Sequence, residues 1–243
     1  MKIRLDELLL QRKLVPDIGR ARALIIAGEV LVHDRVVDKV GAPCEQLAPV
    51  RIRRQCPYVS RGGLKLEKGL NHFGIDPGDK VCIDIGASSG GFTDCLLQHG
   101  AAKVYAVDVA YGQLDWKIRQ DPRVVVLERC NARQLTAALI PDPLDLAVMD
   151  ASFISVTKLI PPLLSLFASS VALLALIKPQ FELPRAMVPA GGVVLLEELH
   201  QVAIDSVTTA ARGFGLSSGG VVASPILGPK GNKEFLIFLH SRK

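Results

Sequence analysis

The chain has 243 residues, 49% hydrophobic and 22% charged, which excludes a disordered protein and leaves room for one large domain with a small companion. Its formal net charge of +5 lies wholly in residues 1–62, which hold 12 Lys and Arg against 7 Asp and Glu. This asymmetry excludes a uniformly cationic surface and favours a basic N-terminal module joined to a neutral body.

Cysteine spacing and apolar runs indicate the compartment. The five cysteines include no Cys-x-x-Cys pair, which favours reduced thiols over disulfides or a zinc site. Residues 1–13 carry charges where a signal peptide would be apolar, and the most apolar stretch, residues 163–177, is short for a membrane span. We therefore expect a cytoplasmic protein with no membrane segment and no metal.

The first sixty residues predict two helices followed by short strands. Leu5, Leu8 and Leu9 recur at helical spacing, Asp17 is a candidate N-cap for a second helix, and Gly28 is suited to end it. Alternating residues then predict strands over 29–32 and 35–37 around a His-Asp turn, and a basic strand over 50–54. We expect a small α+β domain over residues 1–60.

This segment resembles the S4-type RNA-binding domain in its RLDELL run, its GRARALIIAGEVLV run and the pair Lys39 and Gly41. The resemblance implies that arginines on one face bind the phosphates of structured RNA, which makes binding sensitive to salt. The other interpretation is a small basic subdomain with solvated arginines. The candidate RNA-binding residues are Arg4, Arg20, Arg22, Arg51, Arg53, Arg54 and Arg61.

Residues 56–63 (CPYVSRGG) are rich in Pro and Gly and predict a linker to a second domain over residues 61–243. From Leu64 onward, helical segments alternate with apolar β-branched ones, which predicts an α/β fold with a mostly parallel sheet and an antiparallel pair at its end. The expected strands are 81–85, 103–108, 124–128, 144–149, 171–177, 219–225 and 234–239. The expected helices are 64–73, 92–99, 117–120, 156–167 and 197–212.

The run VCIDIGASSGGFTDCLLQHG predicts a buried strand, a glycine-rich turn and a helix start. Such a turn can cradle a dinucleotide, but its glycines do not follow G-x-G-x-x-G. Asp84 precedes the turn, where its charge would repel a pyrophosphate and attract an ammonium group. Asp108 ends the next strand, where an acidic residue commonly accepts ribose hydroxyls. A turn without any ligand and an NAD-type site remain as alternatives.

The DIGASSGGFT loop and the VDVAYGQL strand together resemble the class I S-adenosylmethionine-dependent methyltransferases, which have a Rossmann-like sheet. The resemblance implies S-adenosylmethionine as cofactor, with its methionine end at the loop, its ribose at Asp108 and its adenine near Asn131. The cofactor-binding residues implied are Asp84, Gly86, Ser88, Ser89, Gly90, Asp108, Asn131 and Asp150.

Four charged residues stand beside strand ends or helix starts: Lys65, Asp150, Lys178 and Glu234. Singly, each predicts no more than a solvated or ion-paired side chain. As a set they resemble the catalytic tetrad of the FtsJ (RrmJ) ribose 2′-O-methyltransferases. With the N-terminal segment in front, residues 2–240 are similar to the TlyA family, also called haemolysin A-like, whose members methylate cytidines of ribosomal RNA.

The resemblance implies that Lys178 accepts or orients the proton of a ribose 2′-hydroxyl, with Lys65 as a second cation and Asp150 and Glu234 holding the lysines. Ribosomal RNA or ribosomal subunits would be the partner. One departure from the family is the loop 183–196, LPRAMVPAGGVVLL, which replaces polar or flexible positions. The alternatives are a non-catalytic RNA-binding ribosome-assembly factor and, last, a membrane-active haemolysin.

Overall fold

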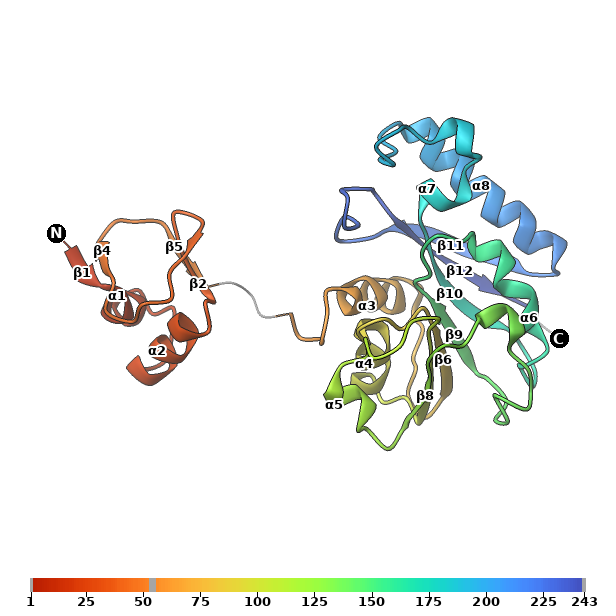
Figure 1. Ribbon diagram of the computed structural model, residues 1–243, viewed down its shortest axis with the longest axis horizontal. Coiled ribbons are helices and arrows are strands. Elements are labelled where there is room, and N and C mark those ends of the chain that lie inside the picture. Colours follow the sequence, from red (N-terminus) through yellow and green to blue (C-terminus); the bar gives the residue numbers. More distant parts are fainter. Residues whose placement is uncertain (1, 53–55, 242–243) are drawn as a thin grey trace. The chain divides into compact units, whose positions relative to one another are not determined.

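The computed structural model describes residues 2–52 and 56–241. The chain divides into two compact units, Met1–Cys56 and Pro57–Lys243, which are described separately (Figure 1). The elements of the smaller unit are β1 (Lys2–Arg4), α1 (Leu5–Gln11), α2 (Ile18–Ile26), β2 (Val30–Val32), β3 (Arg35–Val36), β4 (Pro43–Glu45) and β5 (Val50–Ile52).

The two helices of the smaller unit pack their predicted apolar faces into one core. Leu5, Leu8 and Leu9 of α1 are buried, and Asp17 caps α2 because its Oδ1 accepts a hydrogen bond from the backbone N of Arg20 at 2.7 Å. The strands form a three-stranded antiparallel sheet in the order β3-β2-β5. A second pairing, β1 with β4, has no counterpart among the predicted strands, since three-residue strands show no usable alternation.

The larger unit is built around a seven-stranded sheet in the order β11-β12-β10-β9-β6-β7-β8 (Figure 1). All neighbours are parallel except β10 with β12 and β11 with β12, so the predicted α/β fold is confirmed. The strands are β6 (Val81–Ile85), β7 (Lys103–Val107), β8 (Val124–Leu127), β9 (Leu146–Met149), β10 (Ala172–Ile177), β11 (Ser217–Ala223) and β12 (Phe235–His240). The α-helices are α3 (Gly62–Phe73), α4 (Gly91–Gln98), α5 (Trp116–Arg119), α6 (Ile160–Leu164), α7 (Pro179–Glu182) and α8 (Glu197–Gly213), and the 3₁₀ helices are η1 (Ala132–Gln134), η2 (Val156–Lys158) and η3 (Arg185–Met187).

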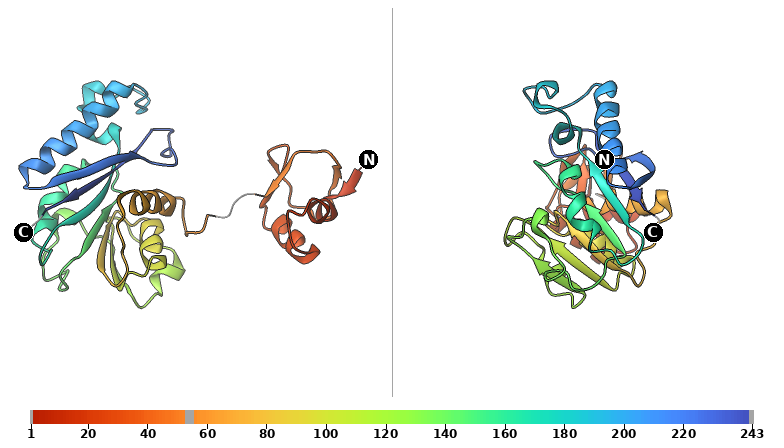
Figure 2. Two further views of the ribbon diagram at one scale, coloured as in Figure 1. Left: turned by 180° about the vertical axis from the view of Figure 1, so that it is seen from behind. Right: turned by 90° about the vertical axis from the view of Figure 1, so that its right-hand side faces the viewer.

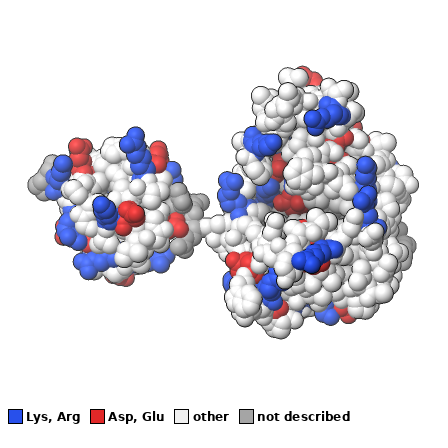
Figure 3. All heavy atoms as spheres, in the orientation of Figure 1, with Lys and Arg blue, Asp and Glu red and all other residues white. Residues whose placement is uncertain are grey.

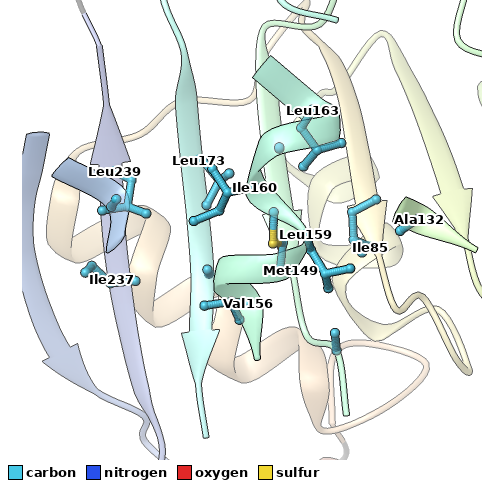
Figure 4. Packing of buried hydrophobic residues seen from close by; sticks show 14 of the residues in the cluster. Ile85, Ala132, Met149, Val156, Leu159, Ile160, Leu163, Leu173, Ile237 and Leu239 are labelled. Carbon is cyan, nitrogen blue, oxygen red and sulfur yellow. The ribbon is translucent and has the colours of Figure 1, made fainter. Parts of the chain in front are cut away.

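Both faces of this sheet are covered, as its continuous apolar strands require (Figure 2). On one face, side chains such as Ile85, Met149 and Leu173 pack against η2, α6 and α8 (Figure 4). On the other face lie α3 and α4, and Gly69 of α3 is so close to Leu174 of β10 that an added Cβ would come within 2.7 Å of Leu174 Cδ2. The core therefore fixes the strand ends from which the site is built.

The helix predicted over 156–167 divides in two. Residues 156–158 form η2, and α6 begins at Ile160 with Pro161 and Pro162 in its first turn. Proline lacks the N–H that a helix interior needs, but it is tolerated in the first turn. The two prolines therefore start a new helix rather than continue one.

Residues 56–63, predicted as a linker, belong largely to the larger unit. Tyr58 is 7% exposed, and its ring lies so close to Gly63 that a Cβ there would come within 2.2 Å of Tyr58 Cγ. The backbone N of Val59 donates to Asp94 Oδ2 at 2.8 Å. Pro and Gly composition predicts an irregular segment, but it does not show that the Tyr58 ring packs against Gly63 of α3.

Candidate active site

A tight turn connects β6 to α4 and forms the floor of the site. Gly86 has φ +86°, and a Cβ at this position would come within 2.9 Å of the backbone O of Asp150. Gly90 has φ +93° and packs on Leu114, so it turns the chain into α4 and lines none of the three cavities described below. Both positions therefore require glycine for steric as well as conformational reasons.

Asp108 joins this turn to the segment after β7. Its Oδ2 accepts a hydrogen bond from the backbone N of Ser88 at 2.8 Å, and its Oδ1 accepts one from the N of Ala110 at 2.8 Å. It lines a cavity of about 370 Å³, the Asp108 cavity, whose other lining residues include Gly86, Ser88, Asn131 and Asp150. Four of the predicted cofactor residues thus meet Asp108 in one cavity.

The expectation that Asp84 lines the same site does not hold. Asp84 is fully buried and lines none of the three cavities, because its side chain points from β6 toward α4, where Oδ2 accepts from Thr93 Oγ1 at 2.7 Å. Burial raises the pKa of Asp84 to about 7, and the nearby carboxylates of Asp150 and Asp108 add to the rise. Asp84 lies beneath the turn rather than in the cavity.

The four charged residues singled out from the sequence lie together at the carboxyl edge of the sheet. Lys65 is on α3, Asp150 follows β9, Lys178 follows β10 and Glu234 precedes β12. Lys178 Nζ lies 2.6 Å from Asp150 Oδ1, Lys65 Nζ lies 3.8 Å from Asp150 Oδ2, and Lys65 Nζ lies 2.6 Å from Glu234 Oε2. The result is a largely buried row of alternating charge, Lys178–Asp150–Lys65–Glu234.

This row borders two further cavities. The first, the Lys65 cavity of about 310 Å³, is lined by Lys65, Asp150 and Lys178, by Gly86 to Ser89 and by Arg61. The second, the Gln180 cavity of about 420 Å³, shares Ser152, Lys178 and Pro229 with the first. In the face of the larger unit seen in Figure 3, acidic side chains lie in a hollow with basic side chains scattered around it.

Ser152 is a site residue that sequence reasoning missed. It lines all three cavities, and its Oγ accepts a hydrogen bond from Lys178 Nζ at 2.9 Å. A serine two positions after Asp150 is too common to be singled out, but the tight contact with Lys178 shows that it helps to hold the lysine.

The segments that carry Asp150 and Lys178 are joined beyond these two residues. Glu182 Oε2 accepts from Ser155 Oγ at 2.5 Å, and Glu182 Oε1 accepts from the backbone N of Val156 at 2.9 Å. The rings of Phe153 and Phe181 lie 5.2 Å apart between their centroids. Burial raises the pKa of Glu182, and its two hydrogen bonds oppose that rise. We call residues 152–156 and 178–182 the paired segments.

The predicted RNA-binding arginines do not share one environment. Arg4 and Arg22 both pair with the buried carboxylate of Asp6, at 3.0 and 3.1 Å, and they hold the pKa of Asp6 below its ordinary value. Arg51 pairs with Asp34 at 2.8 Å, and Arg20 is exposed. Arg61 belongs to the larger unit and lines the Lys65 cavity. The remaining two, Arg53 and Arg54, lie outside the described residues.

Comparison with known proteins places this geometry in a family. Residues 58–241 match the model of the FtsJ-like methyltransferases. The chain belongs to the FtsJ-like methyltransferase family. It is 43% identical over 241 residues to the protein named "Putative rRNA methyltransferase YqxC" of Bacillus subtilis, a match that covers 98% of this chain and 86% of that protein.

Two further relatives of this FtsJ-like methyltransferase span nearly the whole chain. The 16S/23S rRNA (cytidine-2′-O)-methyltransferase TlyA of Mycobacterium tuberculosis is 40% identical over 243 residues, covering 99% of this chain and 91% of that protein. A solved structure of a "putative hemolysin" from Streptococcus thermophilus is 38% identical with a TM-score of 0.77, and covers 100% of this chain and 89% of that one. The resemblance to the TlyA family is therefore confirmed.

The described residues include neither a metal site nor a membrane-spanning helix. Within residues 2–52 and 56–241, no three His, Cys, Asp or Glu side chains are placed to hold a metal ion. In the same part of the chain, no helix combines the length and the apolar character needed to cross a membrane.

Proposed function

We propose that this FtsJ-like methyltransferase transfers a methyl group from S-adenosylmethionine to the 2′-hydroxyl of a ribose in ribosomal RNA, with cytidine as the target nucleoside. The observation that carries the proposal is the row Lys178–Asp150–Lys65–Glu234 beside the turn after β6. The relative TlyA, 40% identical over the full chain, is named for this reaction.

The Asp108 cavity suits the adenosine part of the cofactor. Its walls include the apolar side chains of Ile85, Val107 and Leu159, and it has polar groups at Asp108 and Asn131. Asp108 would accept hydrogen bonds from the ribose hydroxyls, and the Gly86–Ser89 backbone would line the methionine end in the adjoining Lys65 cavity. When bound, S-adenosylmethionine supplies an electrophilic methyl group on a sulfonium.

Lys178 would act on the hydroxyl that receives the methyl group. Its amine is held by Asp150 and Ser152, so Nζ has a fixed position at the wall that the Lys65 and Gln180 cavities share. A protonated Nζ can donate to the hydroxyl oxygen and orient its lone pairs. When neutral, the same amine can take the hydroxyl proton as a general base, a role typically worth about 10²–10⁴-fold in rate.

The smaller unit would hold the RNA as an S4-type domain. Asp6 brings the guanidinium groups of Arg4 and Arg22 to one carboxylate, and both arginines stay about half exposed. Two guanidinium groups held together can bind phosphate oxygens through forked hydrogen bonds. The basic excess of residues 1–62 supports the same role.

The test is transfer of labelled methyl from S-adenosylmethionine to purified ribosomal subunits and to free ribosomal RNA. We expect the wild type to label one of them, and Lys178→Ala to lower the rate by about 10²–10⁴-fold while the cofactor still binds. Lys68→Ala is the matched control, because Lys68 is an exposed residue of α3 close to Lys65, and it should behave as wild type. Absence of label, or full activity of Lys178→Ala, would contradict the proposal, and binding to subunits without transfer would favour an assembly factor.

A further inference from the structure

A turn after β7 forms one wall of the Asp108 cavity. Ala110 and Gln113 line this cavity, and Gln113 Oε1 accepts a hydrogen bond from Ser88 Oγ at 3.3 Å. Gly112 has φ +73°, a conformation that glycine adopts more readily than other residues. We call residues 109–113 the cavity turn. Its position decides where this wall meets the turn after β6.

Two carboxylates at neighbouring strand ends hold the cavity turn. Asp108 follows β7 and Glu128 follows β8, and the backbone N of Asp108 donates to the O of Leu127 at 3.0 Å. Asp108 Oδ1 accepts a hydrogen bond from the backbone N of Ala110 at 2.8 Å. Glu128 Oε1 accepts one from the backbone N of Gly112, also at 2.8 Å. The two carboxylates therefore fix two alternate backbone groups of the same turn.

Glu128 is itself held by an arginine. Arg119 Nη2 lies 2.5 Å from Glu128 Oε1, and the side chain of Glu128 is 10% exposed. The Arg119 guanidinium holds the pKa of Glu128 below its ordinary value, so the carboxylate is ionised at neutral pH. An ionised acceptor binds a backbone N–H more strongly than a neutral one. Glu128 lines none of the three cavities, so it can act on a bound molecule only through the turn.

The residues after the cavity turn also contact the turn after β6. Leu114 is 7% exposed, and a Cβ on Gly90 would come within 2.9 Å of Leu114 Cδ1. The backbone N of Asp115 donates to the O of Ser89 at 3.2 Å. Because Ser89 lines the Lys65 cavity, a shift of the cavity turn would be felt in that cavity as well as in the Asp108 cavity.

We infer that Glu128 is a positioning residue for the cofactor, which it serves by fixing the cavity turn beside Asp108; the inference rests on the proposed function, which puts the cofactor ribose at Asp108. Without the Glu128 carboxylate, the N–H of Gly112 loses this acceptor, and the N–H of Ala110 keeps its own. The turn and Asp108 would then be less well oriented toward the ribose hydroxyls. The loss should fall on cofactor binding rather than on methyl transfer, because Lys178 and its partners are carried by other elements.

The test is calorimetric titration of S-adenosylmethionine into the full-length protein, with kcat measured by methyl transfer at saturating cofactor. We expect Glu128→Ala to raise the dissociation constant by about 10-fold, as for one lost hydrogen bond to a charged group, with little change in kcat. Glu128→Gln should restore most of the affinity, because its amide oxygen still accepts from Gly112. Glu128→Asp is too short to reach Gly112 but keeps the charge, so it should show the same loss even if Glu128→Ala does not fold.

Asp121→Ala is the matched control. Asp121 also accepts from one backbone N–H and one guanidinium, both of Arg123, at 2.9 and 2.8 Å. It lies in the connection between α5 and β8 and lines none of the three cavities. Its dissociation constant for S-adenosylmethionine should equal that of the wild type.

A readout specific to the ribose separates positioning from a general loss of stability. The wild type should bind S-adenosylhomocysteine about 10-fold more tightly than its 2′-deoxy analogue, and Glu128→Ala should lose most of this preference. The inference is overturned if Glu128→Ala binds S-adenosylmethionine as the wild type does, or if it loses affinity and keeps the full ribose preference. If the wild type binds S-adenosylmethionine but methylates no RNA, the proposed function fails, and the same dissociation constants still decide the inference.

Discussion

At the scale of single residues, Asp84 makes stability depend on pH. The folded protein keeps a proton on Asp84 up to a pKa of about 7, whereas the unfolded chain releases it near 3.8. The folded state thus binds more protons between these values, and the free energy of unfolding should fall as pH rises from about 4 to about 7 and then level off. Asp84→Asn should remove that fall, which is on the order of a few kcal/mol, in urea unfolding at pH 5 and pH 8. If the free energy of unfolding of Asp84→Asn falls between pH 5 and pH 8 as much as that of the wild type, the prediction is wrong.

Asp84 also shows what the sequence pattern could and could not predict about the site. Alternation along β6 places Asp84 on the face shared with Cys82, but alternation does not say whether that face is covered at this point. Only the packing of α4, with Thr93 over the carboxylate, shows that Asp84 lies beneath the turn. Asp108 was predictable because a residue at the end of a parallel strand lies at the edge where ligands bind.

At the scale of elements, the paired segments position Lys178. Glu182→Ala removes both acceptors that hold Ser155 and Val156, so residues 152–156 should lose their fixed place against residues 178–182. We expect kcat to fall by about 10- to 100-fold, since small misplacements near reacting groups cost about this much. The dissociation constant of S-adenosylmethionine should change little, which stopped-flow or calorimetric binding would show.

Glu182→Gln is the conservative control. It keeps one acceptor for the backbone N of Val156, and Ser155 Oγ can accept from its amide, so most of the activity should return. If Glu182→Ala and Glu182→Gln lose the same activity, or if KM for the cofactor rises with the loss, the positioning role is wrong.

Elements with long apolar runs were predictable, and those held by single contacts were not. The strand over 81–85 was predicted with its observed bounds, because Val81 is partly buried and the four residues after it are fully buried, which leaves little choice. The pairing of β1 with β4 was missed, since each has three residues and alternation over so few positions is not informative. The link between Glu182 and Ser155 joins residues 27 apart in sequence, and no local pattern reports it.

At the scale of the whole molecule, the boundary between the two units decides which truncation is informative. Removal of residues 1–56 leaves Tyr58 and Ser60 in place, and Ser60 lines the Lys65 cavity. We expect this protein to bind S-adenosylmethionine with wild-type affinity. Its affinity for ribosomal RNA should fall, and the slope of log affinity against log salt should flatten by about one for each phosphate that the smaller unit would otherwise neutralise.

Removal of residues 1–60 is the contrasting truncation. It also removes the Tyr58 ring, which packs on Gly63, and Ser60, which lines the Lys65 cavity. Both thermal stability and cofactor affinity should therefore drop. Equal cofactor binding by the two truncated proteins would contradict this prediction. If the 57–243 protein and the full chain bind RNA with equal affinity at every salt concentration, the smaller unit takes no part in substrate binding.

The charge asymmetry of the sequence indicated this division into a basic unit and a neutral one. It could not place the boundary, because net charge changes gradually while packing changes at one residue, between Cys56 and Pro57. Composition likewise assigned Arg61 to the basic part, whereas its place in the wall of the Lys65 cavity depends on α3.

The contact between Lys65 and Glu234 has a consequence for the order of assembly. These residues are 169 apart in sequence, whereas the turn after β6 and Asp108 come from neighbouring strands. Closing a long loop is entropically costlier and slower than joining adjacent segments, so the cofactor turn can form before β12 inserts between β10 and β11. During synthesis, a partly emerged chain would then hold its methyl donor without the row that acts on the acceptor. Such an intermediate would be catalytically inactive. The protein could modify RNA only after β12 has entered the sheet and brought Glu234 to Lys65.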